Sequence, residues 1–469
     1  MVLALVILPI VAGFALFLLP ASDRVVSKVT GCIVAAATFG LALMTSDQSQ
    51  TARWLSRPFS AAFHFSNSGI GYWIVLMLAL TTFCAILATS VPRTRSFIAL
   101  MLLLEGTMMG VFLARDLLLF ALFWDAMLIP VFFVLIGWGE HPATAWRYLI
   151  YNFAGGLTLL LATAAYGVLA GSTDVIAKAN IAHIGNIWQP WILAGFAFAF
   201  LVKTPVWPFH TWMPPTYSDT PSPMVSVVSS VQSKAGLYGF IVVGLALLPE
   251  SMRAATVPML WLGLISLLYG ALVALVQTDS KRIVAYSSLS HLGLILLAIF
   301  SFNPLALRGA LIYIIAHGLF SAALFLILGY IEEREETRSL LRLGGLGRQN
   351  PRLAGAFVIA ALAALGLPGL AGFAGELVIL TGLFAAGNFW VTLIALIPII
   401  LAAAYMLRLF QDMMNGPEVA DVPVRADLTW IEALAVAPLL LAIVLIGVNP
   451  HALTTFNGAP YAASVPLQR

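Results

Sequence analysis

The sequence predicts an all-α integral membrane protein with about 14 transmembrane helices. Three observations predict it: 61% of the 469 residues are hydrophobic, only 9% are charged, and the mean hydropathy is +1.00. Soluble domains carry about 25% charged residues. Because one crossing takes roughly 20 apolar residues, this length accommodates many crossings and almost no domain outside the membrane.

The predicted crossings are apolar runs separated by short polar or charged loops. They lie near residues 1–20, 25–45, 70–91, 96–114, 116–138, 146–171, 190–212, 221–248, 255–277, 283–302, 308–331, 354–386, 388–411 and 428–448. The first run lacks a basic leading segment, so we expect a retained helix rather than a cleaved signal peptide.

Two of these runs are interrupted. Pro205 and Pro208 break the run at 190–212, and Gly366-Leu367-Pro368-Gly369 breaks the run at 354–386. Such breaks are tolerated in lipid only where protein or a cavity covers them. Interrupted helices five crossings apart are typical of inverted repeats with binding sites near the midplane. The predicted divisions are helices 1–3 in 1–95, a first five-helix repeat (helices 4–8) in 96–250, a second, inverted repeat (helices 9–13) in 251–415, and helix 14 with a tail in 416–469.

The loop cations predict an orientation. Of the 23 Lys and Arg residues, fourteen lie in loops that follow odd-numbered segments and seven lie on the other side. The positive-inside rule then places the odd loops in the cytoplasm and both termini on the non-cytoplasmic side. The two remaining cations, Lys203 and Lys234, lie inside predicted crossings.

Those two lysines are the main functional signal. An unpaired charge at the centre of a membrane helix costs roughly 2.5–3.5 kcal/mol. Snorkelling of the long side chain to the interface is the structural alternative, but Lys203 and Lys234 are both central in their runs. Lys234 is also flanked by side chains that support water: Ser229, Ser230, Gln232 and Ser233. We therefore expect both lysines to carry protons.

Three carboxylates lie inside the crossings. Asp125 is either a structural hydrogen-bond acceptor or the partner of a lysine whose proton affinity it adjusts. Glu376 follows the second helix break, where it is either a carboxylate of the proton exit or a group that ties up freed backbone atoms. Glu105 has no evident lysine at its depth, so its structural and functional interpretations remain equally open.

Two histidines, His291 and His317, lie on consecutive predicted helices. A single histidine on an apolar face is more often a core residue, but imidazole relays protons near neutral pH and two on neighbouring helices favour that role. His317 is the better placed, because His291 follows the loop cations Lys281 and Arg282 by only about nine residues. His210 is predicted to lie in a loop near an interface.

Other chemistry has little support. Cys32 and Cys84 lie alone in apolar runs, and there is no CxxC cluster, Walker loop, dinucleotide fingerprint, HExxH motif or nucleophile elbow. We expect no cofactor, metal or redox centre in this chain. The formal net charge of +3 gives no reason to expect a nucleic-acid partner.

Several stretches resemble a known family. They are FLVKTPVWPFHTWMP, TPSPMVSVVSSVQSKAGLYGF, DSKRIVAYSSLSHLGL, AHGLFSAALFLILGYIEEREETRSLLRLGGL and LGLPGLAGFAGELVIL. In this order, across roughly residues 95–415, they resemble the antiporter-like proton-translocating membrane subunits of respiratory complex I, the NADH-quinone oxidoreductase. Within the family they are most similar to the subunit M type, called subunit 4 in mitochondria.

The resemblance implies a multi-pass subunit of the bacterial inner (plasma) membrane, placed in the membrane arm beside homologous antiporter-like subunits. It implies that FMN, iron–sulfur clusters and quinone belong to partner subunits. It also implies a relay in which a carboxylate pairs with a lysine on the broken seventh helix; the corresponding residues are Asp125, Lys203, Lys234, His291, His317 and Glu376. A glutamate on the broken twelfth helix is typical of the M type.

Two positions depart from the family pattern. The family usually has glutamate where this chain has Asp125, which is one methylene shorter, so the contact with Lys203 is expected to lengthen. Tyr217 stands where the family usually has histidine, so no histidine role applies there.

Three other interpretations remain. The nearest is a homologous subunit of a multisubunit Na⁺/H⁺ antiporter or of a membrane-bound hydrogenase. An independent carrier of an organic solute lacks extra charged or aromatic groups for its solute. An inert scaffold would use the buried polar residues only to hold helices together.

Overall fold

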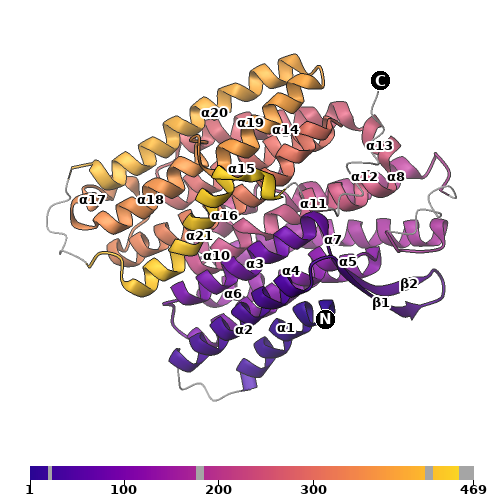
Figure 1. Cartoon of the computed structure of the whole chain (residues 1–469), viewed down its shortest axis with the longest axis horizontal. Helices are drawn as coiled ribbons and strands as arrows, with labels where there is room; N and C mark the ends of the chain where they lie inside the picture. The colour runs from indigo at the N-terminus through magenta and orange to yellow at the C-terminus, as the bar shows by residue number, and fades with distance from the viewer. Residues whose placement is uncertain (19–23, 176–183, 418–425, 454–469) are drawn as a thin grey trace.

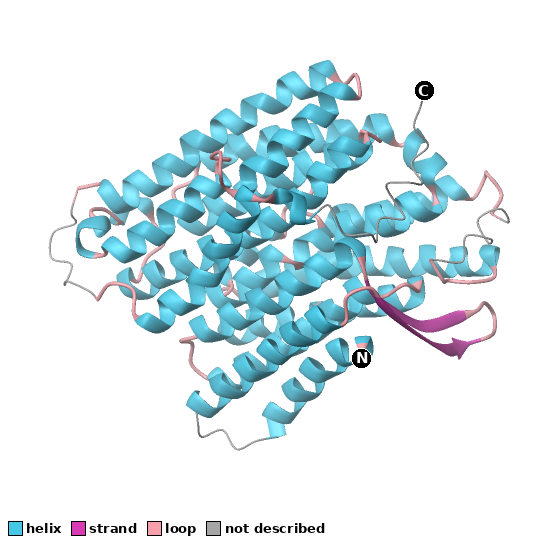
Figure 2. Cartoon of the chain, viewed as in Figure 1, coloured by secondary structure: helices cyan, strands magenta, loops and turns pink. Residues whose placement is uncertain are grey.

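The computed structural model describes residues 1–18, 24–175, 184–417 and 426–453. The loop cations Lys178, Arg425 and Arg469, and the end of the first predicted crossing at 19–20, lie outside these ranges. The described chain is a bundle of long, roughly parallel helices, with the N-terminal helices at one side and the helices of residues 351–410 at the other (Figures 1 and 2). The last long helix, Trp430–Val448, lies between them and packs against the helix Gly69–Ala88.

Eleven helical stretches in the described part are long and apolar enough to cross a membrane. They are α2 (Arg24–Met44), α3 (Gly69–Ala88), α4 (Thr94–Leu113), α5–α6 (Leu117–Ala126 and Leu128–Trp138), α7 (Pro142–Ala170), the stretch Ser222–Leu247, α14 (Thr256–Val276), α15 (Ser280–Phe300), α16 (Pro304–Glu335), α20 (Phe389–Phe410) with η5 (Gln411–Asn415), and α21 (Trp430–Val448).

The other three predicted crossings correspond to shorter helices. These are α1 (Val2–Leu18), α8 (Gln189–Lys203), and the pair α18 (Pro351–Ala364) and α19 (Ala371–Ala385). The short helix α9 (Met213–Asp219) begins directly after the predicted end of the run at 190–212. The all-helical membrane class is confirmed, while the exact count of 14 and the internal repeat stay predictions. Short surface helices complete the described chain: α13 (Pro249–Ala254), η4 (Leu340–Arg342), α17 (Leu346–Gln349) and η6 (Pro450–Leu453).

The core of the bundle is built around α15 and α16, which are buried along almost their whole length. α16 packs against α3, α15, α18, α19 and α21, and against the stretch that begins at Ser222. By contrast, α2, α20 and α21 lie at the periphery, where most of their residues are exposed or only partly buried. In water such a surface would be unstable, so these faces belong against lipid or other membrane subunits.

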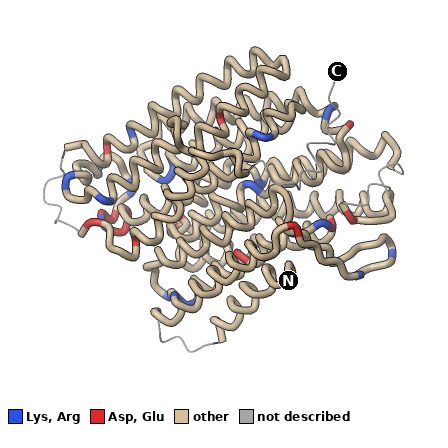
Figure 3. The backbone as a smooth tube through the Cα atoms, viewed as in Figure 1, with Lys and Arg blue, Asp and Glu red and all other residues tan. Residues whose placement is uncertain are grey.

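Side chains close several helix starts, where backbone N–H groups lack partners. Asp116 accepts from the N–H groups of Leu118 and Leu119 at the start of α5. Asp279 and Asn303 cap α15 and α16 in the same way. Figure 3 shows that charged residues gather toward the helix ends, with only a few inside the bundle.

Both predicted helix breaks are present. α8 ends at Lys203, and turns through Pro205 and Pro208 separate it from α9. The second break separates α18 from α19, and there Gly366 and Gly369 adopt φ values of 77° and 92°. L-residues with a Cβ rarely adopt this conformation, which explains the two glycines.

Two features were not predicted. The loop after α2 forms an antiparallel hairpin, β1 (Gln48–Leu55) and β2 (Ala61–Asn67), which projects from the helix ends in Figure 1. The stretch 222–247 is not one regular helix. It is divided into α10 (Ser222–Ser230), the 3₁₀ turn η2 (Gln232–Lys234), α11 (Ala235–Gly239), the π-helical η3 (Phe240–Gly244) and α12 (Leu245–Leu247).

Candidate functional site

Lys203 is the last residue of α8, directly before the first helix break. Its side chain is buried, and its Nζ has no hydrogen-bond partner. The ammonium position instead lies over the indole ring of Trp124, 5.1 Å from the ring centroid. Snorkelling is therefore excluded, because the amine ends inside the protein and not at an interface.

Asp125 lies next to this lysine site, at the end of α5, where Met127 interrupts the helix before α6 continues. The carboxylate packs on α7: a Cβ added at Gly156 would lie 1.7 Å from Asp125 Oδ1. Oδ1 has no hydrogen-bond partner, and no ion pair within 4.0 Å joins Asp125 to Lys203 among the described residues. Lys203 and Asp125, which were predicted to pair, are thus both next to Trp124, but they do not form an ion pair with each other in this structure.

Lys234 lies on η2, where the helix that begins at Ser222 loses its α-helical hydrogen bonds. Val231 has φ −124° and ψ −50°, outside the α-helical region. This distortion frees the Ser229 carbonyl, which accepts from Lys234 Nζ, and the Nζ also donates to Ser233 Oγ at 3.2 Å. A 3₁₀ segment inside a helix often marks a functional hinge. Lys234 is fully buried and has no carboxylate partner.

Gln232 connects the two lysine regions. Its Nε2 donates to the hydroxyl of Tyr148 on α7 at 2.8 Å and to the Met127 carbonyl at 3.5 Å. Met127 is the residue that interrupts α5–α6 beside Asp125, so one amide reaches from the Lys234 turn to the Asp125 turn. All these groups are polar and enclosed, which is the setting in which hydrogen-bond networks couple most strongly.

His317 and His291 lie side by side, with ring centroids 5.5 Å apart. Both rings are buried, and none of their four nitrogens has a hydrogen-bond partner. A core histidine normally satisfies its ring nitrogens. Four unsatisfied nitrogens in one enclosed place therefore favour the relay interpretation, in which waters or transient protons are the partners.

Tyr313 lies between His291 and Glu376, so that His317, His291, Tyr313 and Glu376 form one row of contacting side chains. Tyr313 was not among the residues predicted from the sequence. Its hydroxyl donates to Glu376 Oε1, and its ring centroid lies 5.7 Å from that of His291. A signal existed, because Tyr313 and His317 are four residues apart and so share a helix face. Glu376 itself lies at the second break: a Cβ at Gly366 would lie 2.3 Å from its Oε2.

Glu105 is not part of this row. It is fully buried on α4 and neither carboxyl oxygen has a hydrogen-bond partner. His210, predicted near an interface, lies in the turns between α8 and α9 but is buried, with its ring 5.1 Å from that of Tyr269. Within the described part of the chain, neither residue forms a hydrogen bond, ion pair or ring contact with the two lysines or with His291 and His317.

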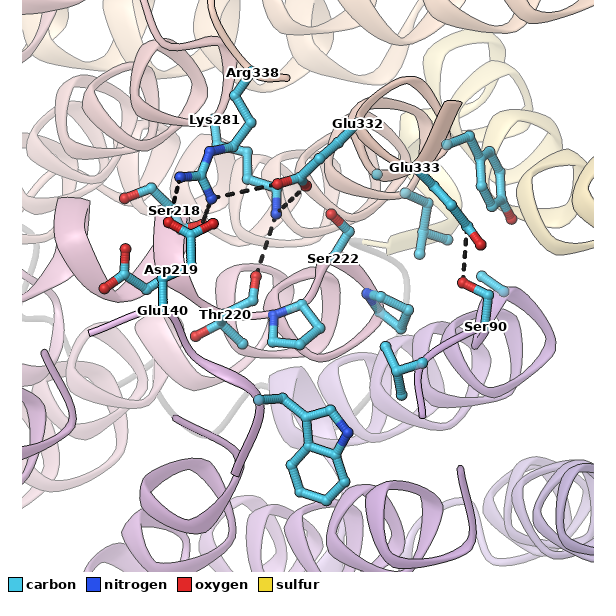
Figure 4. Close-up of a pocket in the computed structure, with 18 of the residues that line it drawn as sticks. Ser90, Glu140, Ser218, Asp219, Thr220, Ser222, Lys281, Glu332, Glu333 and Arg338 are labelled. Atoms are coloured by element: carbon cyan, nitrogen blue, oxygen red, sulfur yellow. Dashed lines mark hydrogen bonds and ion pairs between the residues drawn. The ribbon is translucent and has the colours of Figure 1, made fainter. Parts of the chain in front are cut away.

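A cavity of about 340 Å³ opens where several of the odd-numbered loops meet (Figure 4). Its wall takes residues from the ends of α3, α6, α9 and α16, and from the starts of α10 and α15. Arg338 forms ion pairs there with Glu140 at 2.9 Å, Glu332 at 3.3 Å and Asp279 at 3.4 Å. Burial disfavours the charged guanidinium, but these contacts outweigh it and raise the pKa of Arg338.

One group of side chains beside this cavity has the spacing of metal ligands within the described ranges. It consists of Glu140, His141 and Asp219, whose candidate ligand atoms lie within 4.8 Å of one another. Each already has a protein partner: Glu140 pairs with Arg338, and Asp219 accepts from Thr144 Oγ1 at 2.6 Å and contacts His141 Nδ1 at 3.1 Å. The group is thus satisfied by the protein alone.

Taken together, an apolar helical bundle with a buried row of lysine, histidine, tyrosine and carboxylate side chains defines a class: ion-translocating, multi-pass membrane subunits. The sequence profile of the transmembrane region of NADH:quinone oxidoreductases and Mrp antiporters matches residues 114–402. The chain belongs to this family, and its curated relatives include many proteins named NADH-quinone oxidoreductase subunit M.

Among these relatives, subunit M of Rhodobacter capsulatus is 35% identical over 412 residues, covering 83% of this chain and 80% of the relative. Subunit M of Rickettsia prowazekii is 34% identical over 411 residues, with 85% and 82% covered. The resemblance predicted from the sequence motifs is confirmed.

Solved structures agree. A chain of respiratory complex I from Thermus thermophilus with bound NADH superposes with a TM-score of 0.89 and 32% identity, covering 99% of this chain and 98% of that one. A chain of the Mrp complex from Dietzia sp. gives a TM-score of 0.85 at 20% identity, with 99% and 97% covered, and at that identity it shows the fold alone.

Proposed function

We propose that this chain translocates protons as a membrane-arm subunit of NADH:quinone oxidoreductase. Protons move from the cytoplasm outward through a relay of Asp125, Lys203, Lys234, His317, His291, Tyr313 and Glu376. Quinone reduction elsewhere in the complex supplies the energy, and FMN, iron–sulfur clusters and quinone lie in partner subunits. This chain carries no redox centre, and both termini lie on the non-cytoplasmic side of the bacterial inner membrane.

The observation that carries the proposal is the enclosed row His317–His291–Tyr313–Glu376. Two imidazoles with four unpartnered nitrogens lie in contact with a phenol that already donates to a carboxylate. Each group can bind or release a proton, and the neighbouring rings lie 5.5 and 5.7 Å apart. Centroids at these distances belong to rings in direct edge-to-face contact, so no apolar side chain separates one proton-binding group from the next.

Lys234 supplies the proton to this row. Its ammonium has only neutral oxygen partners, Ser229 and Ser233, so no counter-ion holds the charge in place. After the proton leaves for His317, the neutral amine can be protonated again from the other side. Glu376 receives the proton beside the break between α18 and α19, where the helix backbone is open.

Lys203 and Asp125 control the electrostatic energy of the proton on Lys234, according to whether the two form an ion pair. Moving one charge against 100 mV requires about 2.3 kcal/mol. Two charges about 4 Å apart attract by about 4 kcal/mol at an effective dielectric constant of 20. Closing or opening one Asp125–Lys203 ion pair is therefore sufficient to drive one proton step. The open contact in this structure corresponds to one of the two states.

The alternative of a Na⁺/H⁺ antiporter or hydrogenase subunit has weaker support. The chain is 32–35% identical to complex I relatives of which it covers 80–98%, but 20% identical to a chain of the Mrp complex. Proton pumping that requires NADH and quinone would separate the two.

Replacing Lys234 by methionine in the assembled complex tests the proposal. In proteoliposomes we expect NADH-driven proton pumping to fall at least tenfold, because methionine matches the length of the side chain but cannot carry a proton. Lys28→Met is the control: Lys28 lies on peripheral α2, and its Nζ donates to the Leu87 carbonyl at 2.9 Å, away from the relay residues. An assembled Lys234→Met complex that pumps at the rate of the control would refute the relay.

A further inference from the structure

The cavity in Figure 4 lies at the start of the helix that carries Lys234. Its wall includes the first residue of α10, Ser222 (Figure 4), together with Gly329 of α16, which packs directly against Ser222. In the proposed orientation this end of the bundle faces the cytoplasm. The cavity is thus an aqueous space on the side from which protons must come.

The charges around the cavity favour cations. Four carboxylates line it against two basic side chains, which leaves a formal charge of −2; the six residues are Glu140, Asp219, Glu332, Glu333, Lys281 and Arg338. Lys281 pairs with Glu332 at 2.6 Å, and Figure 4 shows Arg338 among the carboxylates. A concave site with one sign of excess charge raises the local concentration of the opposite ion. Here the attracted ion is the proton or hydronium.

Ser222 forms an inner corner of this cavity with an unsatisfied hydroxyl. Its side chain is 6% exposed and its Oγ has no hydrogen-bond partner. Gly329 leaves room for the hydroxyl, since a Cβ there would lie 2.6 Å from Ser222 Oγ. A buried hydroxyl without a protein partner is normally satisfied by water, so water is expected to reach this depth.

From Ser222 a stripe of serines leads inward along α10. Ser226 and Ser229 follow at four and seven residues, spacings that place them on one face of α10. Ser233 lies beyond the distortion, on η2, and its hydroxyl donates to the Ser229 carbonyl at 2.9 Å. All three are buried. The stripe ends at Lys234, whose Nζ donates to the Ser229 carbonyl and to Ser233 Oγ. From Ser222 to Ser229 the helix rises about 10 Å.

The facing helix adds one more hydroxyl. Ser321 of α16 lies 3.1 Å from Ser229 Oγ, so the stripe has a polar side across the α10–α16 contact. Ser226 donates within its own helix to the Pro223 carbonyl at 2.7 Å, which leaves the acceptor lone pairs of its hydroxyl free. Alanine would pack between the helices equally well without burying a hydroxyl, so close packing alone does not explain serine at these positions.

We propose that the cavity collects cytoplasmic protons and that the serine stripe Ser222–Ser226–Ser229–Ser233 conducts them to Lys234. A proton enters at the carboxylates, passes Ser222, and moves by exchange along hydroxyls and intervening water to the neutral Lys234 amine, which becomes an ammonium. This assignment rests on the proposed function and adds its uptake route.

The test uses a pair of variants of nearly identical shape, Ser226→Val and Ser226→Thr. Valine and threonine differ only in a methyl group against a hydroxyl, so packing changes are shared and proton conduction is not. In the assembled complex in proteoliposomes, we expect Ser226→Val to lower NADH-driven proton uptake at least fivefold relative to Ser226→Thr. Assembly is verified by native electrophoresis of each purified complex.

Gly329→Ala provides a second measurement should Ser226→Val fail to assemble, because its methyl group would take the place of the Ser222 hydroxyl. It too should lower proton uptake at least fivefold. Equal uptake by Ser226→Val and Ser226→Thr, or normal uptake by Gly329→Ala, would overturn the serine route. The Lys234→Met variant, measured in the same assay, separates this proposal from the relay. If Lys234→Met is inactive while the serine variants pump normally, the serine route is wrong and the relay stands. If Lys234→Met pumps normally, the relay itself is wrong.

Discussion

Lys203 Nζ lies 5.1 Å from the centroid of the Trp124 ring, one residue along α5 from Asp125. The indole ring is fully buried, and neither its Nε1 nor the Lys203 amine has a hydrogen-bond partner. A cation over a desolvated aromatic face gains about 2 kcal/mol. Trp124 and Asp125, consecutive on α5, therefore offer an aromatic face and a carboxylate as two alternative partners for one ammonium group.

Removing the Trp124 ring should hold Lys203 and Asp125 permanently in an ion pair. In Trp124→Leu we expect Lys203 to move onto Asp125, because leucine offers the ammonium no aromatic face and the neighbouring residue on α5 carries a carboxylate. Coupled proton pumping should fall about tenfold, whereas Trp124→Phe, which keeps a weaker aromatic face, should retain at least a third of the activity. Proton pumping and NADH:quinone turnover of both purified complexes give the measurement, and equal activity of the two variants would contradict a role for the ring.

Gly156 gives an independent test of the Asp125 position. An alanine there would place its Cβ 1.7 Å from Asp125 Oδ1, so the carboxylate must move away from α7. We expect Gly156→Ala to lower pumping at least fivefold in a complex that still assembles.

Gly155→Ala is the matched control for that change. At this neighbouring position the nearest atoms to an added Cβ are 3.4 Å away, on Ala199, which is ordinary contact. The helix propensity gain is the same in both variants, so a loss of pumping in Gly155→Ala of the same size would show that the effect comes from α7 and not from Asp125.

Most of the fold was predictable because each crossing is a long apolar run, the strongest pattern that a sequence contains. Proline and the Gly366–Gly369 sequence also marked both helix breaks correctly. The β1–β2 hairpin was missed because seven or eight residues such as Ala61–Asn67 carry a weak alternating pattern inside a longer loop. The distortion at Val231 was missed because neither proline nor glycine marks it in the sequence.

The ionisable residues of the candidate site could be predicted from the sequence, because a charged side chain in a lipid-spanning run is costly. Lys203, Lys234 and Glu376 stand out in apolar runs for that reason. Trp124 and Tyr313 carry no such cost, since tryptophan and tyrosine are ordinary residues in membrane helices. The distance between Asp125 and Lys203 was also beyond the sequence, because it depends on where Gly156 and Trp124 place the two side chains.

The carboxylate of Asp427, which lies outside the membrane-spanning segments, is expected to stabilise the fold in a pH-dependent way. It accepts from the N–H groups of Arg352 at 2.9 Å and Leu353 at 3.1 Å, at the start of α18. Burial acts to raise the pKa of Asp427, but these hydrogen bonds and that of the Leu428 N–H outweigh it and lower the pKa. Folding thus favours the ionised form. The stabilisation is present above the unfolded pKa and is lost as the pH falls through the lower folded value.

Asp427→Asn should therefore lower the thermal unfolding midpoint at pH 7, by the equivalent of about 0.5–1 kcal/mol for a weakened helix cap. The difference from the unmodified protein should shrink as the pH falls below about 4, the usual range of an aspartate. Asp412→Asn is the control, since Asp412 pairs only with Arg408 on its own helix. A difference that is constant with pH would contradict the role of the charge.

Tyr313 is the residue whose replacement best separates a relay from a scaffold. Phenylalanine keeps the ring against His291 but removes the hydroxyl that donates to Glu376 Oε1. A hydrogen bond to a charged group contributes about 1.5–3 kcal/mol, and about 1.4 kcal/mol corresponds to a tenfold change in rate. We therefore expect Tyr313→Phe to lower proton pumping roughly tenfold or more.

Tyr166→Phe is the control, because the Tyr166 hydroxyl is buried without a hydrogen-bond partner. If both variants assemble and pump equally, Glu376 receives its proton by a path that avoids Tyr313, and the row of contacts from His317 to Glu376 is structural.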